Sequence, residues 1–119
     1  MIPDVSLNNM AALLKGDTVV VPSHLTFGTT VITPSAGDTT LDGETGSRIE
    51  LSTPTRTNNI VFFEGIRTGA IANDEYLNAT ALFNSTSGGT LYAEATMASV
   101  LHTTTFDIEV DWRIEFNRK

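Results

Sequence analysis

The 119-residue sequence contains no cysteine and only two lysines, Lys15 and Lys119. The absence of cysteine excludes disulfide bonds, thiolate metal sites and cysteine nucleophiles. No apolar run approaches the roughly eighteen residues of a transmembrane helix, and no basic segment precedes an apolar one near the start, so we expect neither a membrane partner nor a secretory signal. Seven basic and fourteen acidic residues give a net charge of −7. This acidity argues against nucleic acid as a partner, because such binding needs a basic patch.

Catalytic signatures are also absent from the sequence. It has neither the G-x-S-x-G motif of serine hydrolases nor a glycine-rich phosphate loop. The two histidines, His24 and His102, have no histidine or glutamate at metal-ligand spacing. We interpret both as ordinary surface or strand residues. The sequence therefore predicts a protein that is not an enzyme and has no cofactor and no bound metal ion.

The longest regular pattern covers residues 106–116, where apolar side chains occupy every even position and charged side chains every odd one. An alternation of period two predicts a β-strand that can bury one complete face. The length of this strand indicates that most of the core is built against its apolar face. The opposite face carries Asp107, Glu109, Asp111, Arg113 and Glu115.

One helix is predicted, over residues 5–15. Apolar side chains at helical spacing form a stripe, Ser6 is a suitable N-cap, and Gly16 suits the position that ends a helix. The stripe consists of Leu7, Met10, Ala11 and Leu14. Such a short helix is marginal in isolation, so it must pack on its own domain or on a neighbouring subunit.

The rest of the chain shows short strand patterns separated by turn signals. Residues 19–21, 24–31 and a segment from Arg48 are expected as strands, and residues 60–63 as a strand covered on both faces because they are all apolar. Residues 76–83 and 90–97 predict a hairpin around the glycine-containing turn 84–89, and residues 33–47 predict a long polar loop.

Seven or eight strands and one N-terminal helix define the expected fold. This pattern predicts one all-β domain over residues 1–119, an antiparallel β-sandwich of jelly-roll type.

Carboxylates provide two weak candidates for Ca²⁺ binding. Asp107, Glu109 and Asp111 could chelate Ca²⁺ or form an acid–base pair, but three like charges beside Arg113 are typical of a solvated strand face. The loop 38–44 is the second candidate, although its spacing does not match an EF-hand.

Several segments together resemble a known group of proteins. The segments are the helix LNNMAALLKG (7–16), the strand LTFGT (25–29), the loop DTTL (38–41), the hairpin ALFN (81–84) through SGGTL (87–91) to Ala93, and the strand IEVDWRI (108–114). They resemble small proteins encoded among the structural genes of tailed viruses of bacteria and archaea. The resemblance implies a non-enzymatic virion component and brings no catalytic residue with it.

The leading hypothesis is a capsid decoration or turret protein, made in the host cytoplasm and displayed on the surface of the virion. We expect it to self-associate as a trimer or pentamer and to dock on other virion proteins. The candidate subunit contacts are Leu7, Met10 and Leu14 of the helix and Asp107, Glu109, Asp111 and Arg113 of the last strand.

Two alternatives stay open. One is a tail-tip or fibre module that binds a receptor. The other is a carbohydrate-binding β-sandwich, with or without Ca²⁺, that recognises a host-surface glycan. Tyr76, Tyr92 and Trp112 are the aromatic side chains available for stacking on a sugar, although Trp112 lies on the apolar face of its strand.

Overall fold

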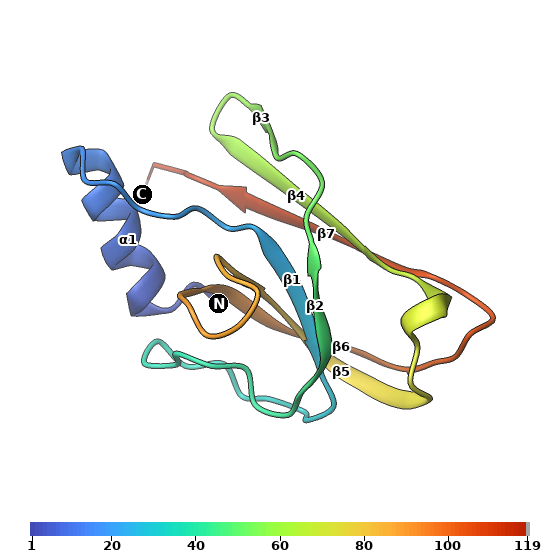
Figure 1. Cartoon of the computed structure of the whole chain (residues 1–119). Helices are drawn as coiled ribbons and strands as arrows, with labels where there is room; N and C mark the ends of the chain where they lie inside the picture. Colours follow the sequence, from blue (N-terminus) through green and yellow to red (C-terminus); the bar gives the residue numbers. More distant parts are fainter. Residues whose placement is uncertain (119) are drawn as a thin grey trace.

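The computed structural model describes residues 1–118 and contains, within them, one α-helix, seven β-strands and a 3₁₀-helix (Figure 1). The strands form two sheets, with the orders β2-β1-β5-β6 and β3-β4-β7, and every adjacent pair is antiparallel. The elements are α1 (Asp4–Lys15), β1 (His24–Gly28), β2 (Glu44–Glu50), β3 (Thr55–Thr57), β4 (Ile60–Arg67), η1 (Gly69–Ile71), β5 (Glu75–Phe83), β6 (Leu91–His102) and β7 (Ile108–Glu115). This confirms the predicted all-β sandwich with one N-terminal helix, while the jelly-roll connectivity stays a prediction.

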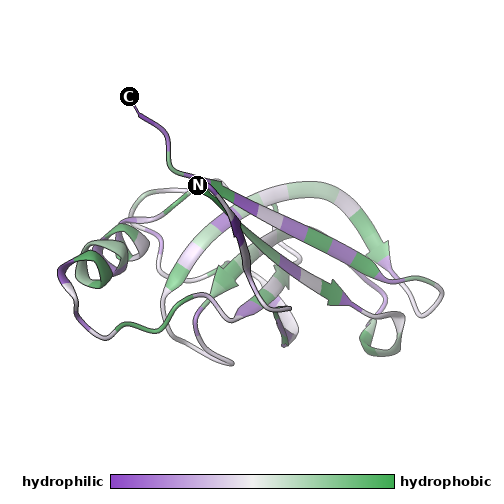
Figure 2. Ribbon diagram, turned by 90° about the horizontal axis from the view of Figure 1, so that it is seen from above, coloured by the Kyte–Doolittle hydropathy of each residue, from purple (hydrophilic) through white to green (hydrophobic). Residues whose placement is uncertain are grey.

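The main core lies between the two sheets. The four-stranded sheet supplies most of its buried side chains, and the three-stranded sheet adds Phe63 and Ile114. The full set is Leu25, Phe27, Phe63, Leu77, Leu82, Tyr92, Ala93 and Ile114. Burying each large aliphatic or aromatic side chain stabilises the fold by roughly 1.5–3 kcal/mol. Along the strands, hydrophobic and hydrophilic residues alternate (Figure 2), as expected where one face of a sheet packs on another layer.

The four-stranded sheet is also covered on its outer face. The segment of residues 29–43, between β1 and β2, folds over it and buries Ile32 and Leu41 (Figure 1). These two side chains join a second cluster with Ala79, Ala81, Phe83 and Leu91. The predicted polar loop 33–47 therefore forms part of a second core, and it ends earlier than expected because β2 begins at Glu44.

The helix is close to its predicted bounds, but it begins differently. Pro3 occupies the N-cap position and Ser6 is buried inside the helix, so the prediction of Ser6 as N-cap was wrong. The backbone N–H of Asp4 donates instead to the carbonyl of Ala36, 2.8 Å away, and ties the helix to the 29–43 segment. Gly16 ends the helix at φ +103°, as predicted, because a left-handed conformation favours glycine.

Two strand predictions were wrong. Residues 19–21 are not a strand: the carbonyl of Val20 accepts hydrogen bonds from the side chains of Asn84 and Tyr92 rather than from a neighbouring strand. The strand β4 is not covered on both faces. Phe63 is buried but Phe62 is exposed, because the three-stranded sheet packs on one side only.

The last strand is shorter and less central than expected. It spans Ile108–Glu115, which leaves Phe106 and Phe116 outside it and exposed. Ile114 is buried, whereas Ile108, Val110 and Trp112 are half-buried. The core is instead organised around β5, a central strand whose last five residues are all buried.

Candidate docking surface

The outward side of α1 is apolar and exposed. The helix is held against the start of β6 by Asn9, whose Nδ2 donates to Thr90 Oγ1 at 3.1 Å and Tyr92 OH at 3.4 Å. Met10 packs partly on the main core. Leu7 is half exposed, and the side chain of Leu14 is 91% exposed. Most of the predicted stripe therefore lies in solvent rather than on the chain's own core.

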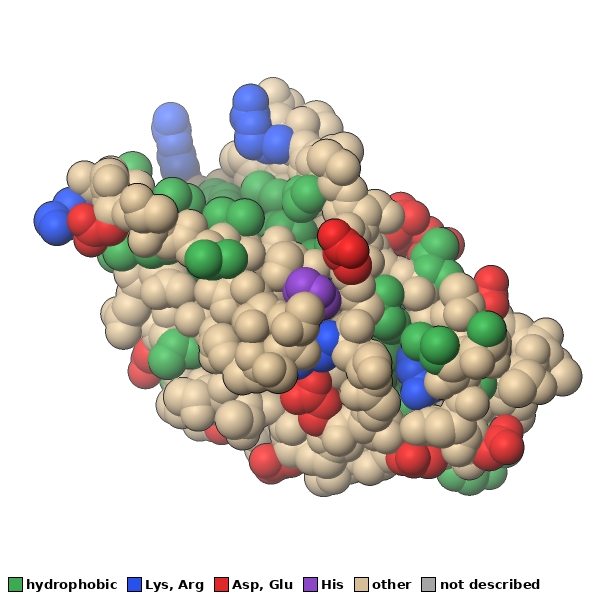
Figure 3. Space-filling model, in the orientation of Figure 1, with side chains coloured by type: hydrophobic (Ala, Val, Ile, Leu, Met, Phe, Trp, Pro, Cys, Tyr) green, Lys and Arg blue, Asp and Glu red, His purple; other side chains and the backbone are tan. Residues whose placement is uncertain are grey.

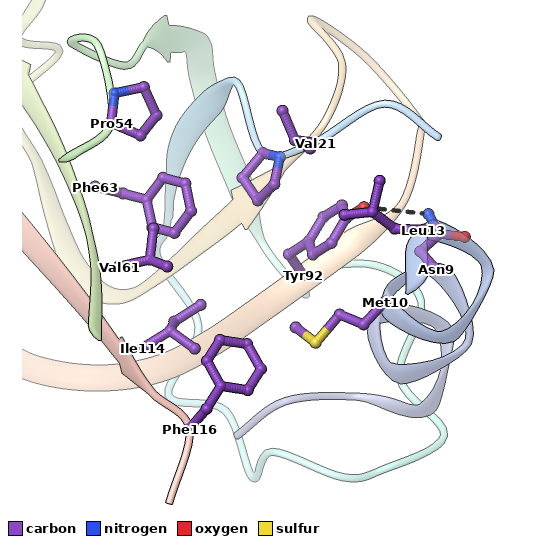
Figure 4. Close-up of a pocket in the computed structure, with 11 residues that line it drawn as sticks. Asn9, Met10, Leu13, Val21, Pro54, Val61, Phe63, Tyr92, Ile114 and Phe116 are labelled. Carbon is purple, nitrogen blue, oxygen red and sulfur yellow. Dashed lines mark hydrogen bonds between the residues drawn. The ribbon is translucent and has the colours of Figure 1, made fainter. Parts of the chain in front are cut away.

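An apolar groove of about 280 Å³ runs between α1 and the three-stranded sheet. Figure 4 shows Met10, Leu13 and Tyr92 on the side of the helix, facing side chains from β4, β7 and the residue after β7. The lining residues are Asn9, Met10, Leu13, Val21, Pro22, Pro54, Val61, Phe63, Tyr92, Ile114 and Phe116. The groove forms because α1 packs against β6 and leaves a gap between itself and β4.

The groove continues onto the outside of the helix. A second apolar hollow shares Met10, Leu13 and Phe116 with it and adds Leu7, Ala11 and Leu14. Figure 3 shows hydrophobic side chains gathered in this region, between α1 and the β3–β4 hairpin. We call this continuous area the docking surface; its residues are Leu7, Met10, Leu13, Leu14, Val21, Val61 and Phe116. Large contiguous exposed apolar areas are candidates for interaction sites.

The predicted contact residues of the last strand lie elsewhere. Glu109, Asp111 and Arg113 are on the exposed face of β7. The prediction that Asp107 shares this face was wrong: it precedes β7, and its Oδ1 accepts a hydrogen bond from the backbone N–H of Gly69 at 2.8 Å. Leu7, Met10 and Leu14 thus lie in one surface, and the charged residues of β7 lie in another.

Strand β4 adds a carboxylate, Glu64, to the acidic residues on the exposed face of β7. Nothing in the sequence indicates this neighbour. Glu64 pairs with Asp111 in the β4–β7 ladder, and oxygens of Glu64, Glu109 and Asp111 lie within 4.8 Å of one another. The negative charges of Asp111 and Glu64 raise the pKa of Glu109 above its ordinary value. All three side chains are exposed, so water solvates them, and three oxygen ligands fall short of the six to eight that Ca²⁺ takes.

The aromatic side chains considered for sugar stacking do not form a shared platform. Tyr92 is buried, and its hydroxyl donates to the carbonyl of Val20 at 3.0 Å. Trp112 is half-buried beside the main core. Tyr76 is 60% exposed on β5.

The predicted strand histidine, His102, has a buried partner that the sequence does not reveal. Arg67 Nη1 lies 2.6 Å from His102 Nδ1, and both side chains are buried. Since guanidinium only donates, Nδ1 accepts, and Nε2 carries the proton donated to the carbonyl of Phe106 at 2.9 Å. This pair joins the ends of β4 and β6 and fixes the turn before β7. Its role is structural.

Sequence reasoning also missed Leu13 and Phe116 of the docking surface. Leu13 follows Met10 by three residues, a helical spacing that would have placed it on the same side as Met10. Phe116 was assigned to the core by the alternating pattern, and no sequence signal shows that β7 ends before it.

Comparisons with protein-family models, with curated proteins and with solved structures give no match for this chain. Within residues 1–118, α1 is too short and too polar to cross a membrane, and no other helix qualifies.

Proposed function

We propose that the protein is a non-enzymatic structural component of a tailed virus particle, a capsid decoration or turret protein that associates with copies of itself and docks on other virion proteins. The observation that carries the proposal is the docking surface. The resemblance of the helix, hairpin and last strand to small virion proteins supports the choice of particle.

The exposed leucines of α1 support self-association. A leucine as exposed as Leu14 contributes little to the fold of its own chain. Covering it, together with Leu13 and Phe116, would remove apolar area from water at about 25 cal/mol per Å². A second copy of the same chain offers the same apolar groove, and homo-oligomers usually close into rings. We expect the ring to be a trimer or a pentamer.

The charged face of β7 complements this arrangement. Glu64, Glu109 and Asp111 concentrate negative charge along the exposed side of the three-stranded sheet. Charges along an edge strand discourage further strand pairing, and like charges disfavour face-to-face contact between two such sheets. Assembly through the docking surface leaves this face in solvent.

The mass of the purified protein in solution, measured by light scattering after size-exclusion chromatography, tests the proposal. We expect a closed oligomer for the natural sequence and a monomer for Leu14→Glu, because the new charge would be buried without a partner. Val31→Glu is the matched control, since Val31 is 74% exposed in the 29–43 segment, outside the docking surface. It should leave the mass unchanged.

The second measurement is the position of the protein in an intact particle, determined by cryo-electron microscopy. Density on the capsid supports a decoration or turret protein, and density at the tail tip would replace that assignment by a fibre module. A stable monomer with no affinity for any particle would overturn the proposal.

A further inference from the structure

A buried carboxylate lies beneath the segment that covers the four-stranded sheet. Glu94, in β6, is 1% exposed. It lines a cavity of about 80 Å³ beneath the 29–43 segment. The other residues that line this cavity all belong to the segment: Ile32, Thr33, Asp38, Thr40 and Asp42. The N-terminal ammonium of Met1 donates to the carbonyl of Glu94, and the N–H of Glu94 donates to the carbonyl of Met1, both at 3.1 Å. A positive charge therefore lies beside this part of β6.

The cavity is unusually rich in oxygen. Three carboxylates and two threonines line it, and none of its lining residues is basic. The backbone N–H of Ser35 donates to Asp38 Oδ2 at 2.9 Å. Among residues 1–118, Glu94 Oε1 is fully buried without a hydrogen-bond partner, while the rest of the carboxyl group lies within hydrogen-bonding reach of Asp38 and of the backbone N–H of Ser35. A buried charged oxygen without a partner is unfavourable by several kcal/mol, so this arrangement requires a proton or a cation.

We propose that this cavity is a Ca²⁺ site formed by the carboxylates of Glu94, Asp38 and Asp42, with oxygens of Thr33 and Thr40 and one or more waters completing the coordination. Ca²⁺ takes six to eight oxygen ligands in a flexible geometry, which suits ligands drawn from an irregular segment and one strand. The volume accommodates the ion with one or two waters, since a water occupies about 30 Å³ in the liquid. Mg²⁺ is less suitable because it demands a rigid octahedron and retains most of its waters.

A proton and Ca²⁺ compete for this site. Burial and the neighbouring Asp38 raise the pKa of Glu94 to about 7, and the backbone N–H of Ser35 and the Met1 ammonium oppose this shift. Ligating carboxylates must be ionised, and binding therefore releases this proton. The sequence predicted no bound metal ion and gave the loop 38–44 only as a weak Ca²⁺ candidate. It has no signal that Glu94 lies beside Asp38, which is 56 positions earlier in the chain.

Calorimetric titration of Ca²⁺ chloride into the EDTA-treated full chain tests the site. We expect one ion per chain, bound more tightly at about pH 8 than at about pH 6, because the buried Glu94 carboxyl must be ionised to ligate Ca²⁺. Glu94→Gln should abolish binding and keep its fold, since the amide is as neutral as the protonated acid and has a similar volume. Asp42→Asn, at an exposed position, should weaken binding at least tenfold.

Glu109→Gln is the matched control, because it removes a carboxylate from the exposed cluster on β4 and β7. It should bind Ca²⁺ as the natural sequence does. Absence of binding at both pH values would overturn the site. Binding that Glu109→Gln abolishes and Glu94→Gln leaves intact would also overturn it, because it would place the ion on the exposed cluster. The test is independent of self-association, since the site lies within one chain.

Discussion

Glu94 makes the stability of the ion-free fold depend on pH. Its pKa is raised from 4.5 to about 7 in the folded chain. Between these values the folded state holds a proton that the unfolded state has released, so the free energy of unfolding falls as the pH rises from about 4.5 to about 7. The loss is at most about 3 kcal/mol over this range. Urea unfolding at a series of pH values, with EDTA present, measures it.

The variant Glu94→Gln provides the comparison for this prediction. It has no proton to lose, so its unfolding free energy should be nearly flat over the same range. Asp38 acts with the opposite sign and at lower pH. Hydrogen bonds with Glu94 and Ser35 lower its pKa below 3.8, so its contribution is lost only as the pH falls further. A natural protein as insensitive to pH as the variant would contradict the raised pKa.

Single residues show where sequence reasoning reaches its limit. The alternating pattern identified Ile114 as a core residue, because period two needs no knowledge of the neighbouring strands. The burial of Glu94 and Arg67 depends on partners far away in sequence, Asp38 and His102. No local sequence pattern indicates that either side chain is buried. Their environment exists only after the 29–43 segment and the turn after β6 have folded.

The 29–43 segment behaves as a structural layer rather than as a free loop. Its anchor Leu41 is 4% exposed and packs with Phe83 and Leu91. Leu41→Ala should lower the free energy of unfolding by about 2–4 kcal/mol, because a cavity replaces a buried side chain. Chemical denaturation measures the loss. Val31→Ala, in the same segment but exposed, should change the value by less than about 0.5 kcal/mol, and equal effects of the two changes would contradict the anchoring role.

The main error at the level of elements was the prediction that most of the core is built against the last strand. The pattern of residues 106–116 is the most regular in the chain, yet β7 has one neighbour, β4, and lies at the edge of its sheet. Strand β5 has a weaker pattern because both of its faces are buried, one against the other sheet and one under the 29–43 segment. Regular alternation thus marks a strand with one exposed face, as in a sheet that is packed on one side only.

The molecule as a whole has a well-buried side and an open side. The four-stranded sheet is packed on both faces, whereas the three-stranded sheet is packed on one, and β3 is exposed along its length. The apolar groove (Figure 4) lies on the open side, and the exposed leucines of α1 line the hollow that adjoins it. The sequence predicted the sandwich and the helix, but not this asymmetry, because it depends on where the helix packs. A docking surface at the open side would complete the covering that the single chain lacks.

Hydrogen–deuterium exchange measured at low and high protein concentration tests this asymmetry. Local stability follows buried contacts, so amides of β5 should exchange slowest and those of β3 and β7 faster at both concentrations. Self-association through the docking surface should add protection only to α1 and to the segment around Phe116 as the concentration rises. Leu14→Glu should remove this added protection and leave β5 unchanged, since Leu14 contributes almost no contact to its own chain. Added protection at the 29–43 segment instead would mean that the chains associate through the well-buried side. The open side would then need another partner.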